Sequence, residues 1–272
     1  MIGFVVPIIP KKHCKNWCLA NLMLERTIRS ICAQTCRNFK VIIVHHEKPE
    51  ITFFDSNIHY VLYSYPDLNV SQLADFEFMS KWFTDVFAER MMDKSRKITL
   101  GCKLAKELGC NYLMAIDSDD MISNKIAEYV NKNTGSKCAG WRISNGYLYS
   151  EGSNFVVKNN QIWAMNGSTH IIRADLVPFP DFKTDFKLIS YNLFQQHAYT
   201  YQRVIDFNVE KLSELPFAGT VYLIHNNNYS QIHKILSANR IKQFIKLLRL
   251  GTLLTKEIKK EFGIYFINPT AS

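Results

Sequence analysis

The sequence lacks the motifs of the commonest nucleotide-binding and hydrolase sites. It contains no GxGxxG, no GxxxxGK[ST] and no GxSxG, so nothing in it indicates the usual dinucleotide site, a P-loop or a nucleophile elbow. It has no CxxC pair, and no cluster of histidines accompanies its seven cysteines, which disfavours a zinc site. Scattered free thiols are typical of the reducing cytoplasm, where we expect this protein.

Long apolar runs are also missing. No uncharged run approaches the about 18–20 residues that a membrane-spanning helix needs. The apolar segment Phe4–Pro10 has no basic stretch before it and no small-residue cleavage site after it, which argues against a signal peptide. Acidic residues are the minority, 24 against 33 Lys and Arg, and the net charge of +9 favours polyanionic partners: nucleotide phosphates, nucleic acid or an anionic membrane.

The composition is that of a globular protein with a large core. Of the 272 residues, 47% are hydrophobic, and 18 Phe, 13 Tyr and 4 Trp supply a core that needs no disulfides. Apolar runs predict strands at Gly3–Pro10, Phe39–His45, Val61–Tyr63 and Tyr112–Ile116, and helical spacing predicts helices at Leu19–Gln34 and Ser95–Leu108. This alternation predicts an α/β fold with a Rossmann-like, mostly parallel sheet flanked by helices.

The second half of the chain has a different texture. Gly, Asn, Ser and Tyr become frequent after about residue 135, and short strands are expected at Phe155–Val157, Gln161–Met165 and Thr220–His225. The last forty residues are basic and are expected to be helical. We predict one domain over residues 1–230, with a nucleotide-binding half at 1–135 and an acceptor half at 136–230, followed by a basic amphipathic helical tail at 231–272.

An acidic cluster, Asp117-Ser118-Asp119-Asp120, follows the fourth predicted strand. Ligands of parallel α/β sheets bind beyond the carboxyl ends of the strands. In an extended Asp-x-Asp, Asp117 and Asp119 would lie on one side and could share a Mg²⁺ or Mn²⁺ ion with substrate phosphates. The alternative is a solvated turn in which Asp119 or Asp120 caps a following helix.

Four segments, in this order, resemble those of family 2 glycosyltransferases. They are Glu25–Val44 (ERTIRSICAQTCRNFKVIIV), Lys97–Ile122 (KITLGCKLAKELGCNYLMAIDSDDMI), Gly167–Leu176 (GSTHIIRADL) and Ile224–Ser230 (IHNNNYS). The resemblance implies a GT-A fold, a nucleotide-sugar donor and a divalent cation. It places Asp117 near the ribose or uridine, Asp119 on the metal, and His225 near the diphosphate or in the metal shell. Independently, a histidine at a strand end suits Mn²⁺.

The sequence departs from this family after the second predicted strand, where members usually carry a pair of aspartates and one of them contacts the base. Here the residues are His45-His46-Glu47. Glu47 or a neutral histidine could accept the imide N–H of uracil. The identity of the base therefore stays open, and a surface loop is the alternative for His46.

Three basic residues at the start of a helix, Lys94, Arg96 and Lys97, form a candidate anion site. The family resemblance implies that a basic residue near here contacts the donor, and we rank Arg96 first, Lys97 second and Lys94 third for this role. A solvated charged turn is the alternative for at least one of them.

The family's catalytic base lies in a Glu-Asp pair that this chain lacks. Asp185, before an apolar helical start, is our candidate for the carboxylate that deprotonates the acceptor, and Asp181 is the reserve. Either could equally be a helix cap. Trp163 and Trp141 are candidates for stacking on a sugar, with core packing as the alternative.

The stretch from Lys234 to Lys260 is basic and amphipathic. Such a stretch suits peripheral contact with the inner face of an anionic membrane. The alternative is a helix that packs on the domain and exposes its charges to water. Nucleic acid is disfavoured, because the aromatic residues do not interleave with the basic ones.

Together these features predict an inverting glycosyltransferase that moves a sugar from a nucleotide diphosphate donor, a UDP-sugar, to a hydroxyl of a glycan or lipid-linked acceptor with Mn²⁺ or Mg²⁺. The alternatives are a sugar nucleotidyltransferase, although Pro7–Lys12 is not the Gly-rich segment those enzymes carry, and a non-catalytic binder of membranes or polyanions. The assigned residues are Pro7, Glu47, Arg96, Lys97, Asp117 and Ser118 for the donor, Asp119 and His225 for the metal, and Asp185 as base.

Overall fold

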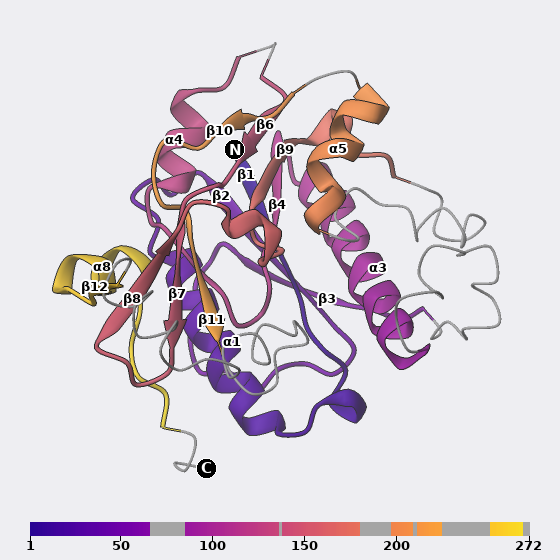
Figure 1. Ribbon diagram of the computed structural model, residues 1–272. Coiled ribbons are helices and arrows are strands. Elements are labelled where there is room, and N and C mark those ends of the chain that lie inside the picture. The colour runs from indigo at the N-terminus through magenta and orange to yellow at the C-terminus, as the bar shows by residue number, and fades with distance from the viewer. Residues whose placement is uncertain (66–84, 136–137, 180–196, 209–210, 225–250, 269–272) are drawn as a thin grey trace.

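The computed structural model describes most of the chain in six stretches. These are residues 1–65, 85–135, 138–179, 197–208, 211–224 and 251–268 (Figure 1). Asp181, Asp185, His225 and most of the basic stretch that begins at Lys234 lie outside the described residues.

The larger of two sheets contains the parallel strands that the sequence predicted. Its order is β10-β6-β9-β4-β1-β2-β3. The strands are β1 (Ile2–Pro7), β2 (Phe39–His45), β3 (Ile58–Leu62), β4 (Tyr112–Ala115), β6 (Gly140–Arg142), β9 (His170–Arg173) and β10 (Ser213–Glu214). β9 runs antiparallel to both β4 and β6, whereas the other neighbouring pairs are parallel.

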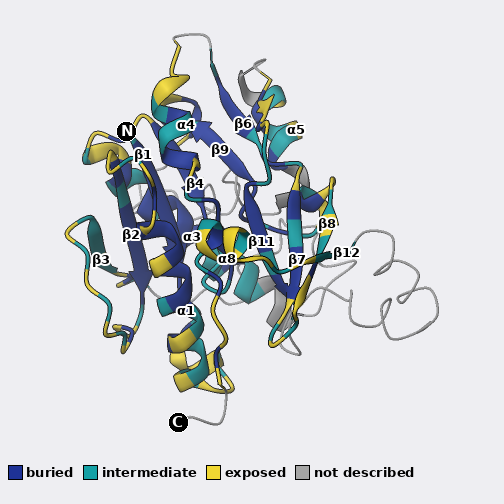
Figure 2. Ribbon diagram, turned by 90° about the vertical axis from the view of Figure 1, so that its left-hand side faces the viewer, coloured by how far each residue is buried: buried dark blue, intermediate teal, exposed yellow. Residues whose placement is uncertain are grey.

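Helices cover both faces of this sheet. The main ones are α1 (Trp17–Cys32), α3 (Asp85–Glu107), α4 (Ile126–Lys132) and α5 (His197–Asn208). Ile28 of α1 shares a core cluster with Phe4, and Ile98 of α3 shares the other large cluster with Val5. Because successive strand residues point to opposite faces, α1 and α3 lie on opposite sides of β1. The predicted α/β class, with a mostly parallel sheet flanked by helices, is confirmed, and Figure 2 shows the central strands β1, β2, β4 and β9 as mostly buried.

α3 packs unusually close to β1. A Cβ atom on Gly3 would lie 2.7 Å from the Cβ of Ala105, and one on Gly101 would overlap the side chain of Val5. Since α3 leads into β4, its N-terminal half lies near the carboxyl ends of the parallel strands. The glycines therefore bring the basic residues near the start of α3 close to the loops that follow β1 and β4.

A smaller sheet packs beside the first. Its order is β12-β8-β7-β11-β5, with β5 (Met121–Ile122), β7 (Gly146–Ser150), β8 (Phe155–Asn159), β11 (Thr220–Ile224) and β12 (Gly251–Leu253). Helix α8 (Lys256–Phe262) buries Phe262 in a cluster with Val156 and Val221 of this sheet. The described part of the C-terminal extension thus contains a strand as well as a helix, and both contact the domain. The boundary after residue 230 remains a prediction.

Several element boundaries differ from those expected. Residues Ile162–Ala164 form a 3₁₀ helix, so the strand predicted at 161–165 is wrong. The reason is local, because the side chain of Asn159 accepts the Gln161 N–H at 2.7 Å and turns the chain at the end of β8. The helix predicted from Ser95 is the second part of α3. Within the described residues, no helix is both long and apolar enough to span a membrane.

Glu25 of α1 gives a pH-dependent contribution to stability. Its carboxylate accepts the Thr52 N–H at 2.8 Å and pairs with Arg29 at 2.7 Å. Burial alone would raise the pKa of Glu25, but the Thr52 and Arg29 hydrogen bonds outweigh it, and the pKa is lowered. A carboxylate with a lowered pKa stabilises the fold at neutral pH, and this stabilisation is lost as the pH falls.

Replacing Glu25 with glutamine is therefore expected to lower the free energy of unfolding by about 1 kcal/mol at pH 7. The difference from wild type should shrink as the pH falls below the ordinary glutamate pKa of about 4.3. Urea unfolding at several pH values measures both. A difference that stays constant from pH 7 to the acid limit would show that the charge of Glu25 is not the cause.

Candidate functional site

The strand order reverses between β1 and β4. After β1 the chain adds β2 and β3 on one side, then returns through α3 to place β4 on the other side of β1. The carboxyl ends of β1 and β4 therefore flank a topological switch point, which is where open α/β sheets bind their ligands. The segments beyond these ends are Ile8–Asn16 and Ile116–Asp120.

The sequence-predicted donor residues gather along this edge. Pro7 ends β1, Glu47 follows β2 by two residues, and Asp117 lies two residues past β4. The Glu47 carboxylate accepts the Lys11 backbone N–H at 3.0 Å, which joins the loops after β2 and β1. Burial would raise the pKa of Glu47, but this hydrogen bond and its own backbone N–H lower it, so Glu47 is ionised.

The acidic cluster forms a turn, and the extended Asp-x-Asp geometry expected from the sequence is wrong. The Asp120 N–H donates to the Asp117 carbonyl at 3.1 Å, which closes a turn over Ser118 and Asp119. The cause is topological, because β4 belongs to the larger sheet and β5, starting at Met121, belongs to the smaller one. The predicted helix cap is also not found, since α4 begins several residues later with Lys125 at its N-cap.

Lys94 provides the positive charge at this turn. Its Nζ lies 2.6 Å from Asp117 Oδ1. Burial would lower the pKa of Lys94, but Asp117 above all, with Asp119 and Asp120, raises it, so Lys94 is charged. Gly167 borders the pair, and a Cβ there would come within 3.2 Å of Asp117 Oδ2. The sequence ranking had placed Lys94 last of the three basic residues.

Arg96 and Lys97 are buried. Arg96 is 2% exposed, and its Nη1 donates to the Tyr63 hydroxyl at 3.4 Å. Lys97 is 0% exposed, and its Nζ donates to the Ile8 carbonyl at 2.6 Å and to Asp93 Oδ2 at 2.7 Å. Lys97 therefore fixes the loop after β1 onto α3. Their predicted contact with the donor stays a prediction.

The segment after β2 joins the same network. His46 Nε2 lies 2.9 Å from Asp93 Oδ1, and the His46 ring packs edge-on against Tyr63 at 5.0 Å. His46 is therefore partly buried and held in place by α3, not part of a solvated loop.

Ser168 fixes the acidic turn through two hydrogen bonds, a role that could not be assigned from the sequence. Its Oγ accepts the Asp117 N–H at 2.9 Å and donates to Asp120 Oδ2 at 2.6 Å, while Asn166 Oδ1 accepts its N–H at 2.6 Å. Asp120 is buried, and burial together with Asp119 and Asp117 raises its pKa well above the ordinary value. The resemblance of Gly167–Leu176 was the only signal that could have pointed to Ser168.

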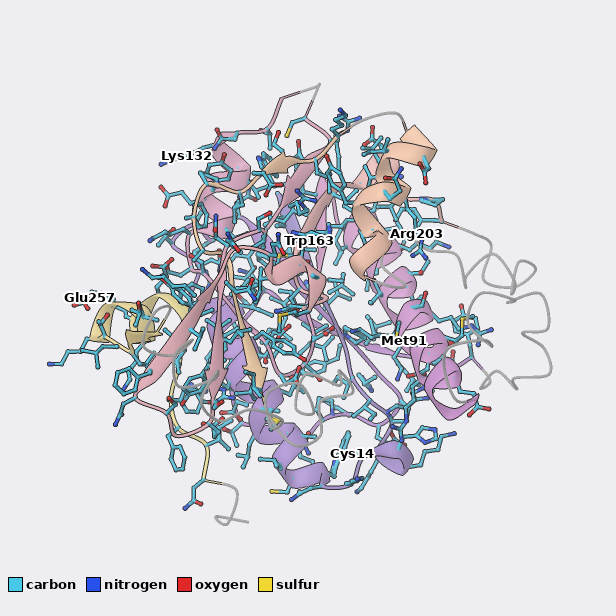
Figure 3. All side chains as sticks on the ribbon, viewed as in Figure 1. Cys14, Met91, Lys132, Trp163, Arg203 and Glu257 are labelled. Atoms are coloured by element: carbon cyan, nitrogen blue, oxygen red, sulfur yellow. The ribbon has the colours of Figure 1, made fainter. Side chains whose placement is uncertain are left out.

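A polar cluster continues along the same edge. β6 and β10 run in the direction of β4, so Arg142 and Glu214 lie at carboxyl ends as well. Arg142 Nε donates to Glu214 Oε1 at 2.9 Å, and Ser144 donates to the other oxygen of this carboxylate. The guanidinium lies 5.2 Å from the Trp163 ring and 4.3 Å from the Tyr201 ring (Trp163 is labelled in Figure 3).

The two predicted sugar-stacking tryptophans have different environments. Trp163 is only partly buried, beside Arg142. Trp141 is 3% exposed and packs between the rings of Tyr112 and Tyr129 at 5.1 Å and 5.7 Å, so its candidate role in sugar binding is wrong. It belongs to the core.

The described residues supply two partly exposed carboxylates at the turn, Asp117 and Asp119. Among all the residues that the structure describes, no group of three or more His, Cys, Asp or Glu side chains is arranged so that it could hold a metal ion. Two carboxylates are what Mg²⁺ uses when substrate phosphates and water complete its shell. These two carboxylates thus fit a cation that is bound jointly by the protein and a diphosphate. His225, the third predicted ligand, lies outside the described residues.

Comparisons with known proteins give only distant similarities. No protein-family model and no curated protein matches the sequence. Among solved structures, TarS of S. aureus matches with 12% identity and a TM-score of 0.45, covering 95% of this chain and 41% of TarS. The 2-C-methyl-D-erythritol 4-phosphate cytidylyltransferase (IspD) of Francisella tularensis matches with 12% identity and a TM-score of 0.42, covering 88% of this chain and 99% of IspD. At these values neither similarity bears on activity.

Proposed function

We propose that this chain is a glycosyltransferase that binds a nucleotide-sugar donor, a UDP-sugar, at the switch point between β1 and β4. One observation carries the proposal: the acidic turn 117–120, with Lys94 at 2.6 Å from Asp117, stands at the carboxyl end of β4. A site with carboxylates and an adjacent charged lysine suits a diphosphate that binds together with a divalent cation.

Different residues would bind the metal, the diphosphate and the base of the donor. Asp119, with Asp117 and His225, would hold Mn²⁺ or Mg²⁺, which when bound neutralises the diphosphate as it departs. Lys94 lies close enough to Asp117 to reach the same phosphates. Glu47, two residues past the end of β2, would accept the imide N–H of uracil, because its carboxylate is ionised.

The reaction would proceed with inversion. Asp185 would accept the proton of an acceptor hydroxyl, whose oxygen bonds to the anomeric carbon on the face opposite the leaving group. The bond from this carbon to the diphosphate oxygen breaks, and the nucleoside diphosphate leaves. Ser168 would keep the turn in position throughout, since it binds both Asp117 and Asp120.

A glycan, free or lipid-linked, is the proposed acceptor, and the cluster around Arg142 supports it. The Arg142 charge is balanced by Glu214, and Trp163 adds an apolar ring. The guanidinium and the carboxylate form a pair without net charge that can hydrogen-bond to sugar hydroxyls, and the neighbouring indole ring can pack on the C–H face of the sugar.

The test is calorimetric titration of UDP, GDP and CDP into the full chain, with and without Mn²⁺. We expect UDP to bind only with the metal. Lys94→Met should weaken this binding at least about tenfold, since a charged hydrogen bond is worth about 1.5–3 kcal/mol. Lys132→Met, on the exposed face of α4, is the matched control and should bind as wild type does.

Failure of a folded sample to bind any of the three nucleotides would refute the proposal and favour a non-catalytic binder. Unchanged binding by Lys94→Met would remove Lys94 from the donor site. Thermal unfolding of each variant shows whether it is folded. Lys94→Met is expected to fold, because the Lys94 side chain is 34% exposed.

A further inference from the structure

Exposed apolar side chains gather where the C-terminal segment meets the turn between β7 and β8. Phe155 is 44% exposed, Leu253 62%, Tyr265 41% and Phe266 60%. We call these four residues the apolar edge. Single exposed apolar residues are ordinary on a protein surface, but a group of them marks an interaction site.

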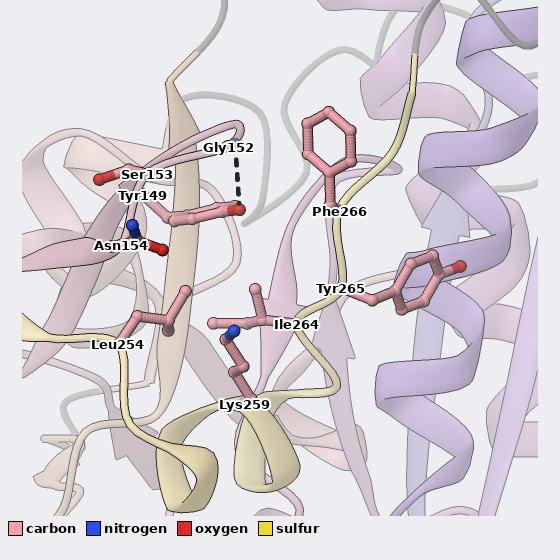
Figure 4. A pocket seen from close by; sticks show the side chains of 9 residues that line it. All are labelled: Tyr149, Gly152, Ser153, Asn154, Leu254, Lys259, Ile264, Tyr265 and Phe266. Atoms are coloured by element: carbon pink, nitrogen blue, oxygen red, sulfur yellow. Dashed lines mark hydrogen bonds between the residues drawn. The ribbon is translucent and has the colours of Figure 1, made fainter.

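Three of the four residues lie at one end of the smaller sheet, and the Tyr265 side chain next to Phe266 is directed towards α1 (Figure 4). Phe155, the first residue of β8, lies directly opposite Leu253 of β12. Phe266 approaches the β7–β8 turn, where a Cβ on Gly152 would lie 3.4 Å from its ring. A cavity of about 330 Å³ opens between this turn, Leu254, Ile264 and Phe266, and Lys259 lines it (Figure 4).

The apolar edge is fixed in place by a partly buried ion pair. Arg26 of α1 is 0% exposed and donates to Glu151 Oε2 at 2.9 Å and to the Tyr265 carbonyl at 2.9 Å. Glu151 Oε1 in turn accepts the Ile267 N–H at 3.0 Å. The bonds hold the β7–β8 turn and residues 265–267 together, so the backbone of Tyr265 and Phe266 is tied to the domain while the Phe266 ring is largely exposed.

Positive charge adjoins the apolar edge. Lys256, Lys259 and Lys260 of α8 are all exposed. Of the two acids of α8, Glu257 is exposed, whereas Glu261 pairs with Lys125 at 2.8 Å. The surface therefore combines aromatic and aliphatic side chains with a local excess of lysine, the combination that binds the headgroup region of anionic bilayers.

We propose that the apolar edge and the lysines of α8 dock on an anionic lipid surface. Phe155, Leu253 and Phe266 would enter the headgroup region, and the lysines would contact lipid phosphates. The inference is independent of the proposed transferase activity. It also differs from the sequence-based expectation, because the contact lies on a folded edge that includes the β7–β8 turn, not only on a basic tail.

Sedimentation with vesicles tests the proposal. The full chain is mixed with phosphatidylcholine vesicles that contain or lack phosphatidylglycerol. We expect binding only to the anionic vesicles, weakened by salt. Leu253→Ser/Phe266→Ser and Lys259→Glu/Lys260→Glu should each weaken binding at least about tenfold, since burying such side chains is worth about 1.5–3 kcal/mol and a lysine near an anionic surface about 1 kcal/mol.

The controls carry the same kinds of change elsewhere. Phe54→Ser alters a side chain that is 85% exposed, before β3, and Lys132→Glu reverses a charge on α4. Both should bind as wild type does, and thermal unfolding checks that every variant is folded. Equal binding by the edge variants and these controls, or no binding of wild type, would overturn the proposal. A dimer that Leu253→Ser/Phe266→Ser dissociates, without vesicle binding, would assign the edge to a second copy of the chain.

Discussion

Alanine in place of Asp119 is expected to abolish Mn²⁺-dependent binding of UDP and to lower sugar transfer by at least about two orders of magnitude. Asp119 is one of two partly exposed carboxylates in the turn after β4. The other, Asp117, already pairs with Lys94 at 2.6 Å. Removing Asp119 would leave a cation with a single carboxylate whose charge Lys94 balances, which is too little to hold it beside a diphosphate.

Asp175→Ala is the matched control for Asp119→Ala. Its carboxylate is 62% exposed and follows β9, whose direction places it at the opposite edge of the larger sheet. Asp175→Ala should bind UDP and Mn²⁺ as wild type does. Wild-type affinity of Asp119→Ala for UDP with Mn²⁺ would show that the assignment of the metal to Asp119 is wrong.

The central strands could be predicted from the sequence because both their faces are buried. Such strands are continuous apolar runs, and the predicted Phe39–His45 is β2 itself. The position of the acidic turn follows from the same signal, since it begins where the apolar run of β4 ends. The shape of the turn could not be predicted, because it depends on β5 pairing with β11, about a hundred residues further along the chain.

The choice among the three basic residues also needed the structure. Successive helix positions are about 100° apart, so Lys94, Arg96 and Lys97 point in different directions from α3. Which of them faces the acidic turn depends on how α3 lies on the sheet, and this is set by the close packing of Gly3 and Gly101. The order of preference from the sequence put Arg96 first, yet its side chain is buried and donates to the Tyr63 hydroxyl.

Replacing Arg26 with methionine is expected to lower the free energy of unfolding by about 3 kcal/mol or more. The Arg26 side chain is fully buried and that of Glu151 is 25% exposed. Loss of the guanidinium would leave the Glu151 carboxylate, which also accepts the Ile267 N–H, without its positive partner and would remove the Arg26 donor from the Tyr265 carbonyl. Urea unfolding measures the loss, and Arg29→Met is the control, because Arg29 is 43% exposed in a surface pair that is worth less than about 1 kcal/mol.

The double variant Arg26→Met/Glu151→Gln separates the charge from the packing. Most of the cost of a broken buried pair comes from the remaining uncompensated charge, so the double variant should be more stable than Arg26→Met alone. A loss within about 1 kcal/mol for Arg26→Met would contradict the account. Because Arg26 also binds the Tyr265 carbonyl and Glu151 the Ile267 N–H, the same loss should loosen residues 265–267 in hydrogen exchange. Loosening of residues 265–267 would show that their position depends on Arg26 of α1 and on Glu151 of the β7–β8 turn.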